Sequence, residues 1–240
     1  MLSNSLATDL DLWSANLPAW TSTFRVLRYD QRGHGGSDVP PGPYSVELLG
    51  RDLLALMDAV GVERASFCGL SLGGATAMWL AVNAPSRIER LVLACTSPRF
   101  GEPEQWLDRA RIVRSEGLEA IADAVLGRWF TPRFHREREA VVMGYRAGLL
   151  GTSAEGYAAC CDALAAWDFR ERVAEIAAPT LVIAGAEDPT VPPEQAALLA
   201  GAIRGSRLVV LESAAHLANV EQPEAFAATV SEHLALEEAA

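Results

Sequence analysis

Ser66-Phe67-Cys68-Gly69-Leu70-Ser71-Leu72-Gly73-Gly74 is the stretch that decides the fold of this 240-residue chain. A short apolar run stops at a serine that stands between glycines, and a helix-forming segment follows. The pattern Gly69-x-Ser71-x-Gly73 is typical of a nucleophile elbow, in which a strand turns sharply into a helix and exposes a serine hydroxyl. A chance glycine-rich turn has the same five-residue pattern, so the flanking sequence has to decide between the two.

The segments around this stretch alternate between strand and helix patterns. Continuously apolar runs such as Leu91–Cys95 are typical of buried parallel strands. The order predicts a mostly parallel α/β sheet with helices on both faces. Strands are predicted at 24–30, 65–70, 91–95, 179–185 and 207–211, and helices at 12–20, 45–60, 72–82, 193–203 and 223–236.

One long segment contains helical patterns only. From Pro98 to about Trp167 the predicted helices cover 104–114, 117–128, 135–150 and 154–166, without a convincing strand. We therefore expect residues 1–97 and 168–240 to form one α/β core, into which residues 98–167 are inserted as a helical cap.

Composition and charge limit the possible partners. The net charge of −11 disfavours nucleic acids and anionic membrane surfaces, because the chain repels phosphate at long range. An anionic substrate would need a locally basic pocket. The four cysteines show no disulfide framework, and neither a leader peptide nor an apolar run of transmembrane length is found. These observations favour a soluble cytoplasmic protein.

A serine nucleophile needs a histidine base and an acid that orients it. In an open α/β sheet these residues are expected after successive strands, in the order serine, acid, histidine. Asp188 follows the strand predicted at 179–185, and His216 follows the last strand. An isolated aspartate in a turn or an isolated histidine is usually structural, but this order is improbable by chance. Ser71, Asp188 and His216 are therefore the predicted catalytic triad, and the amide of Leu72 at the start of the helix is a predicted oxyanion donor.

Several stretches around the triad together resemble one family, the 3-oxoadipate enol-lactonases of the β-ketoadipate pathway, which are α/β-hydrolases. They are Ser3-Asn4-Ser5-Leu6, Tyr29 to Gly35, Gly42-Pro43-Tyr44, Arg128-Trp129-Phe130-Thr131-Pro132 and His216 to Pro223. The resemblance implies a serine hydrolase without cofactor or metal that opens the ring of 3-oxoadipate enol-lactone during aromatic catabolism. Ser71, Asp188 and His216 match the triad of that family.

The resemblance also directs the assignment of the binding residues. Where many α/β-hydrolases carry His-Gly, this chain has Ser3-Asn4-Ser5, so Ser5 is the expected second oxyanion donor. The substrate is a small anionic lactone, and Arg99, just after the strand at 91–95, is the expected partner of its carboxylate. Trp106 and Trp129 could form walls of the site, although cap tryptophans more often pack than contact ligands.

Two other kinds of function remain open at this stage. Another esterase-type α/β-hydrolase, such as a perhydrolase or a carbon–carbon bond hydrolase, would keep the same triad. A ligand-sensing or inactive protein of this fold could keep it too.

The beginning of the chain departs from the family. The resemblance implies that relatives have further strands before Ser3, including one between those matching 24–29 and 65–70. We therefore expect the N-terminal strands to be missing, with no regular strand before Leu12 and either an empty slot or direct pairing between the two neighbours.

Overall fold

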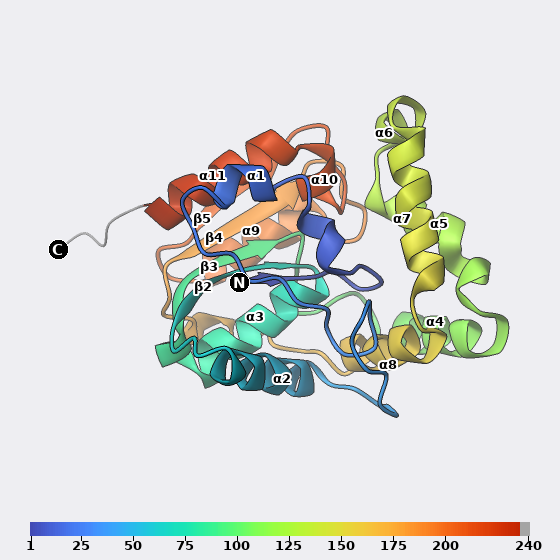
Figure 1. Cartoon of the computed structure of the whole chain (residues 1–240), viewed down its shortest axis with the longest axis horizontal. Helices are drawn as coiled ribbons and strands as arrows, with labels where there is room; N and C mark the ends of the chain where they lie inside the picture. The colour runs from blue at the N-terminus through green and yellow to red at the C-terminus, as the bar shows by residue number, and fades with distance from the viewer. Residues whose placement is uncertain (236–240) are drawn as a thin grey trace.

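The structure is a computed structural model that describes residues 1–235. Its centre is a parallel sheet of five strands in the order β1-β2-β3-β4-β5 (Figure 1). The strands are β1 (Leu2–Ser3), β2 (Ala65–Leu70), β3 (Ile88–Ala94), β4 (Thr180–Gly185) and β5 (Arg207–Leu211). All six residues of β4 and all but one of β3 are buried. The predicted mostly parallel sheet is therefore confirmed.

Helices cover both faces of this sheet. α2 and α3 lie on one face, and α1 and α11 lie on the other (Figure 1). α9 packs against β4 and β5, and α10 joins β5 to α11. These helices are α1 (Leu17–Trp20), α2 (Val46–Ala59), α3 (Leu72–Asn83), α9 (Pro193–Ala202), α10 (Ala218–Glu221) and α11 (Pro223–Ala235).

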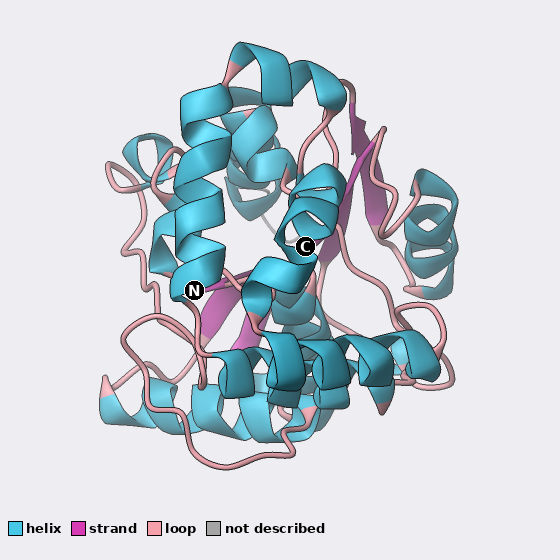
Figure 2. Ribbon diagram, turned by 90° about the vertical axis from the view of Figure 1, so that its right-hand side faces the viewer, coloured by secondary structure: helices cyan, strands magenta, loops and turns pink. Residues whose placement is uncertain are grey.

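The helix-only segment forms a separate group beside the sheet. Its helices lie together on the right of Figure 1 and are seen from another side in Figure 2. The helix predicted at 135–150 is interrupted at Arg138, which leaves a short helix before a longer one. The helices are α4 (Pro103–Glu116), α5 (Ala122–Trp129), α6 (Pro132–Glu137), α7 (Glu139–Gly151) and α8 (Ala154–Ala165).

Other predicted boundaries shift by a few residues. The helix predicted at 12–20 is two short turns, a 3-10 helix at Leu10–Trp13 and α1. Ser45 caps α2 as its side chain accepts a hydrogen bond from the amide of Leu48. The last residue of the predicted closing helix, Leu236, lies outside the described residues.

The expectation that no regular strand precedes Leu12 was wrong, because β1 lies there. β1 lies between β2 and the 24–28 segment: Cys68 N donates to Met1 O (2.9 Å), and Leu2 N donates to Leu27 O (2.9 Å). Two residues are too few for a strand pattern to be recognised, which is why sequence analysis missed them. The strand predicted at 24–30 is reduced to one bridge, Leu2 with Arg28.

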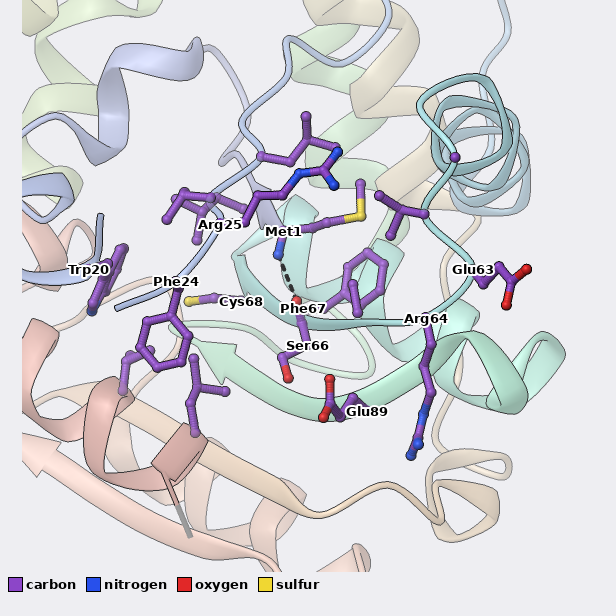
Figure 3. A pocket seen from close by; sticks show the side chains of 18 residues that line it. Met1, Trp20, Phe24, Arg25, Glu63, Arg64, Ser66, Phe67, Cys68 and Glu89 are labelled. Atoms are coloured by element: carbon purple, nitrogen blue, oxygen red, sulfur yellow. Dashed lines mark hydrogen bonds between the residues drawn. The ribbon is translucent and has the colours of Figure 1, made fainter. Parts of the chain in front are cut away.

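A groove of about 660 Å³ begins where β1 starts. Figure 3 shows it between Phe24 and Arg25 on one side and Ser66 and Phe67 on the other. The Met1 nitrogen points into the groove and donates to Ser66 O (2.6 Å). The expected gap in the sheet is therefore partly present, beyond the two residues that β1 supplies.

Within residues 1–235, no helix combines the length and the apolarity that crossing a membrane requires. The same residues contain no group of three or more His, Cys, Asp or Glu side chains placed to hold a metal ion.

The packing of α3 against β1 gives a test of the fold. A Cβ atom on Gly73 would collide with the backbone oxygen of Ser3, so Gly73→Ala should force β1 and α3 apart. We expect a loss of roughly 1–3 kcal/mol in the free energy of unfolding in urea. Gly144→Ala is the matched control, because no atom lies within 4 Å of its added Cβ and alanine favours the helix α7. Equal stability of the Gly73→Ala variant and the parent would contradict this packing.

Candidate active site

Ser71 occupies the turn between β2 and α3 in a strained backbone conformation. Its φ of 56° and ψ of −115° are unusual for a residue with a side chain. Its amide donates to Ala94 O (2.9 Å), and its carbonyl accepts from the Thr96 hydroxyl (2.7 Å). Both bonds come from β3 and the residues after it, so the neighbouring strand holds the turn in place.

The glycines at this turn are required by close approaches. A Cβ on Gly69 would collide with the carbonyl of Gly73, and one on Gly74 would lie 2.6 Å from the Thr96 side chain. The small residues therefore allow α3 to start directly above β2. The first amides of α3, including that of Leu72, have no acceptor within the helix and lie beside Ser71.

Asp188 and His216 are brought together from the ends of β4 and β5. His216 Nδ1 lies 2.8 Å from Asp188 Oδ2, and both side chains are almost fully buried. The other Asp188 oxygen accepts from the amides of Thr190 (2.8 Å) and Val191 (3.1 Å). These amides fix the carboxylate so that it can orient the imidazole.

Ser71 and His216 line one small pocket between the sheet and the α4–α8 group. Its volume is about 30 Å³. The pocket also contains Ser5 and, from the α4–α8 group, Trp106 and Trp129, so it brings together residues far apart in the sequence. Its full lining is Ser5, Leu6, Ser71, Trp106, Arg109, Val125, Arg128, Trp129, Tyr157, Thr190 and His216. The larger groove at Met1 has no lining residue in common with it.

The loop that carries Ser5 is held by a buried histidine. His34 Nε2 accepts from the amide of Ala7 (2.9 Å), while Nδ1 lies 3.2 Å from Arg32 O and can donate to it. Burial lowers the pKa of His34 to about 4, so the ring is neutral near pH 7, as this pair of bonds requires. Within residues 1–235, neither the Ser5 nor the Leu6 amide has an acceptor, so both are free to face a ligand oxygen.

Glu221 holds the loop that carries His216. One carboxylate oxygen accepts from the Ala215 amide (2.6 Å), and the other accepts from the amide (3.0 Å) and hydroxyl (2.8 Å) of Thr131. Burial raises the pKa of Glu221, while these three donors act in the opposite direction. The carboxylate thus links the residues after α5 directly to the residue before His216.

Arg99, the expected partner of the substrate carboxylate, does not line this pocket. Its guanidinium forms an ion pair with Glu102 (2.6 Å) beside a different surface cavity. After β3 the chain turns away from Ser71 and His216 towards the start of α4. The position of Arg99 just after a strand does not reveal the direction of this turn. The expectation for Arg99 is therefore corrected.

The pocket instead contains two arginines that sequence analysis missed, Arg109 on α4 and Arg128 on α5. Tyr157 on α8, Val125, Thr190 and Leu6 were missed as well. The periodicity of α4 does not distinguish Arg109 from Arg111 and Arg114 on the same helix. The structure pairs the other two arginines with acidic side chains. Arg128 belongs to the stretch Arg128–Pro132 that resembles the family, but the sequence of that stretch does not indicate which of its side chains faces the pocket.

All four cysteines, Cys68, Cys95, Cys160 and Cys161, are free and buried. Burial raises the pKa of each thiol, so none is suited to act as a thiolate nucleophile. Ser71 is therefore the nucleophile candidate of the pocket.

Comparison with known proteins supplies the context of this site. Residues 2–223 match the family model described as the alpha/beta hydrolase fold. The chain is 43% identical to 3-oxoadipate enol-lactonase 2 of Acinetobacter baylyi and 37% identical to 3-oxoadipate enol-lactonase 1 of that organism. Both matches span 226 residues, which is 94% of this chain and 84% of each relative.

A solved structure agrees with these relatives. The crystal structure of the enol-lactonase from Burkholderia xenovorans superposes with a TM-score of 0.96 at 46% sequence identity. That match covers 98% of this chain and 90% of the other.

Glu221→Gln tests the link to the His216 loop. An amide group cannot accept at both ends, so one donor at Ala215 or Thr131 would lose its partner. We expect the free energy of unfolding to fall by about 1–3 kcal/mol and the turnover of an ester or lactone to fall with it. Glu212→Gln on the exposed surface is the control. Unchanged stability and turnover in Glu221→Gln would show that the carboxylate does not hold the loop.

The depressed pKa of His34 predicts a pH effect. The neutral ring favours the folded state at pH values above about 6.5, and this contribution should be lost as the pH falls from 6.5 towards 4. His34→Gln keeps an acceptor for the Ala7 amide without a titrating ring. Urea unfolding at several pH values in this range should show a steeper loss of stability for the parent than for His34→Gln. Parallel pH profiles would contradict the assignment.

Proposed function

We propose a catalytic mechanism for this chain, which belongs to the α/β-hydrolase family and, within it, to the 3-oxoadipate enol-lactonases. The chain is a lactone hydrolase that converts 3-oxoadipate enol-lactone to 3-oxoadipate. In the proposed mechanism Ser71 is the nucleophile, His216 the base and Asp188 the group that orients it. The observation that carries the assignment is the 2.8 Å contact of His216 with Asp188 behind the pocket that His216 shares with Ser71.

In the acylation step His216 Nε2 takes the Ser71 proton as Oγ attacks the lactone carbonyl. Asp188 holds the proton on Nδ1 and stabilises the imidazolium that forms. The amide of Leu72, together with that of Ser5 or of its neighbour Leu6, donates to the developing oxyanion. The strained turn at Ser71 supports this geometry, because it places the hydroxyl beside the first amides of α3.

Collapse of the tetrahedral intermediate breaks the ring C–O bond. The leaving oxygen departs as an enol, receives its proton from His216 and becomes the ketone of the product, so an acyl group remains on Ser71. Water activated by His216 then hydrolyses the acyl-enzyme and returns the proton to Ser71. The scheme balances without a cofactor or a metal ion.

We further propose that residues 98–167 act as the substrate-binding cap on a core formed by 1–97 and 168–240. Its support is the pocket itself, which has Ser71 and His216 on one side and Trp106 and Trp129 on the other. A cytoplasmic location is also proposed, on the support of the four unpaired thiols.

Ser71→Ala tests the mechanism. The variant should fold like the parent, because the turn tolerates a small side chain, and should lose about 10³-fold or more in kcat, as other serine hydrolases do without their nucleophile. Loss of enol-lactone absorbance measures the rate, with Ser115→Ala on the exposed face of α4 as the control. Retention of half the activity in Ser71→Ala would exclude the serine mechanism.

A further inference from the structure

Two arginines line the pocket of Ser71 and His216 without an acidic partner among residues 1–235. All 20 basic residues of the chain are arginines, and most of those in the described part form ion pairs with carboxylates. Arg109 and Arg128 form no such pair within residues 1–235, although the chain as a whole is strongly acidic. Both line the pocket that contains Ser71 and His216.

The two guanidinium groups are close enough to repel each other. Burial and the charge of Arg109 lower the pKa of Arg128. Like charges that share a site without a counterion raise the free energy of the site, and an anion placed between them removes that cost. The positive charge of the two arginines therefore favours the binding of a negatively charged group in the pocket.

Arg109 and Arg128 are held to different degrees. The Arg109 guanidinium lies 4.6 Å from the centre of the Trp106 ring, which is a cation–π contact. Burial raises the pKa of Tyr157, and the nearby Arg109 charge acts in the opposite direction. Tyr157 is almost fully buried on α8, so α4 and α8 together limit the position of Arg109. Arg128 is more exposed and has no hydrogen-bond partner among the described residues.

We propose that Arg109 and Arg128 together form the carboxylate-binding subsite of the enzyme. Arg109 is the fixed member, and Arg128 is the mobile member that turns onto the carboxylate when the substrate is bound. This assignment rests on the proposed function, because the ligand carboxylate is that of the enol-lactone. It replaces Arg99 as the residue that distinguishes an anionic lactone from a neutral one.

The physical basis is a pair of charge-assisted hydrogen bonds in a shielded pocket. A planar guanidinium can donate two parallel N–H bonds to one carboxylate, and two guanidiniums can share its two oxygens. Loss of one such donor should reduce kcat/KM for the anionic substrate about 10- to 100-fold. A substrate without the carboxylate should lose little or nothing.

A matched pair of substrates tests the subsite. α-Angelica lactone has the same enol-lactone ring with a methyl group in place of the carboxymethyl group. Arg109→Gln and Arg128→Gln should each lower kcat/KM about 10- to 100-fold for the enol-lactone and less than about threefold for α-angelica lactone. The control Arg99→Gln removes an arginine outside the pocket and should change neither value.

Equal losses on both lactones in Arg109→Gln and Arg128→Gln would overturn the proposal, as would unchanged values on both. Salt dependence of the parent enzyme is a second measurement that requires no variant to fold. Its KM for the enol-lactone should rise with ionic strength, while that for α-angelica lactone stays constant, and equal salt dependence would contradict the subsite. Failure of the catalytic assignment would look different, because Ser71→Ala would then retain activity on both lactones.

Discussion

The backbone of Ser71 is the constraint on which the rest of the site depends. A residue with positive φ costs about 1–3 kcal/mol unless its surroundings impose it, and here β3 imposes it through Ala94 O and the Thr96 hydroxyl. The same turn requires Gly73, whose hydrogen faces the carbonyl of Ser3. Ser71 and the loop that begins at Ser3 are thus positioned by one packing contact.

A second set of buried polar bonds positions His216. Asn219 donates to Leu12 O (2.8 Å) and to the Asn16 side chain (3.1 Å), and Asn16 donates back to Asn219 O (3.1 Å). Together with Glu221 these bonds connect the His216 loop to the beginning of the chain and to the residues after α5. Because buried polar groups are costly when unpaired, this network specifies one arrangement of three distant segments.

The parts of the site that sequence could predict are those fixed by strand ends. Ser71, Asp188 and His216 each follow a strand of the same parallel sheet, so their meeting at one edge follows from topology. Arg109 and Arg128 lie on helices whose mutual placement depends on packing between α4, α5 and α8, which no local pattern contains. β1 could not be predicted for another reason. Its two residues are too few for a strand pattern, and only their pairing with β2 and with the 24–28 segment identifies them as a strand.

The small volume of the catalytic pocket has a consequence for the timing of turnover. On the scale at which one water needs about 10–15 Å³, a chamber of about 30 Å³ admits a few waters and no lactone. The pocket therefore has to widen before the lactone enters. Ring opening then converts a compact monoanion into a linear dianion whose new carboxylate forms beside Ser71 and His216. The added charge and the added length both favour departure of the product, so the widening that admits the lactone has to recur before the next turnover.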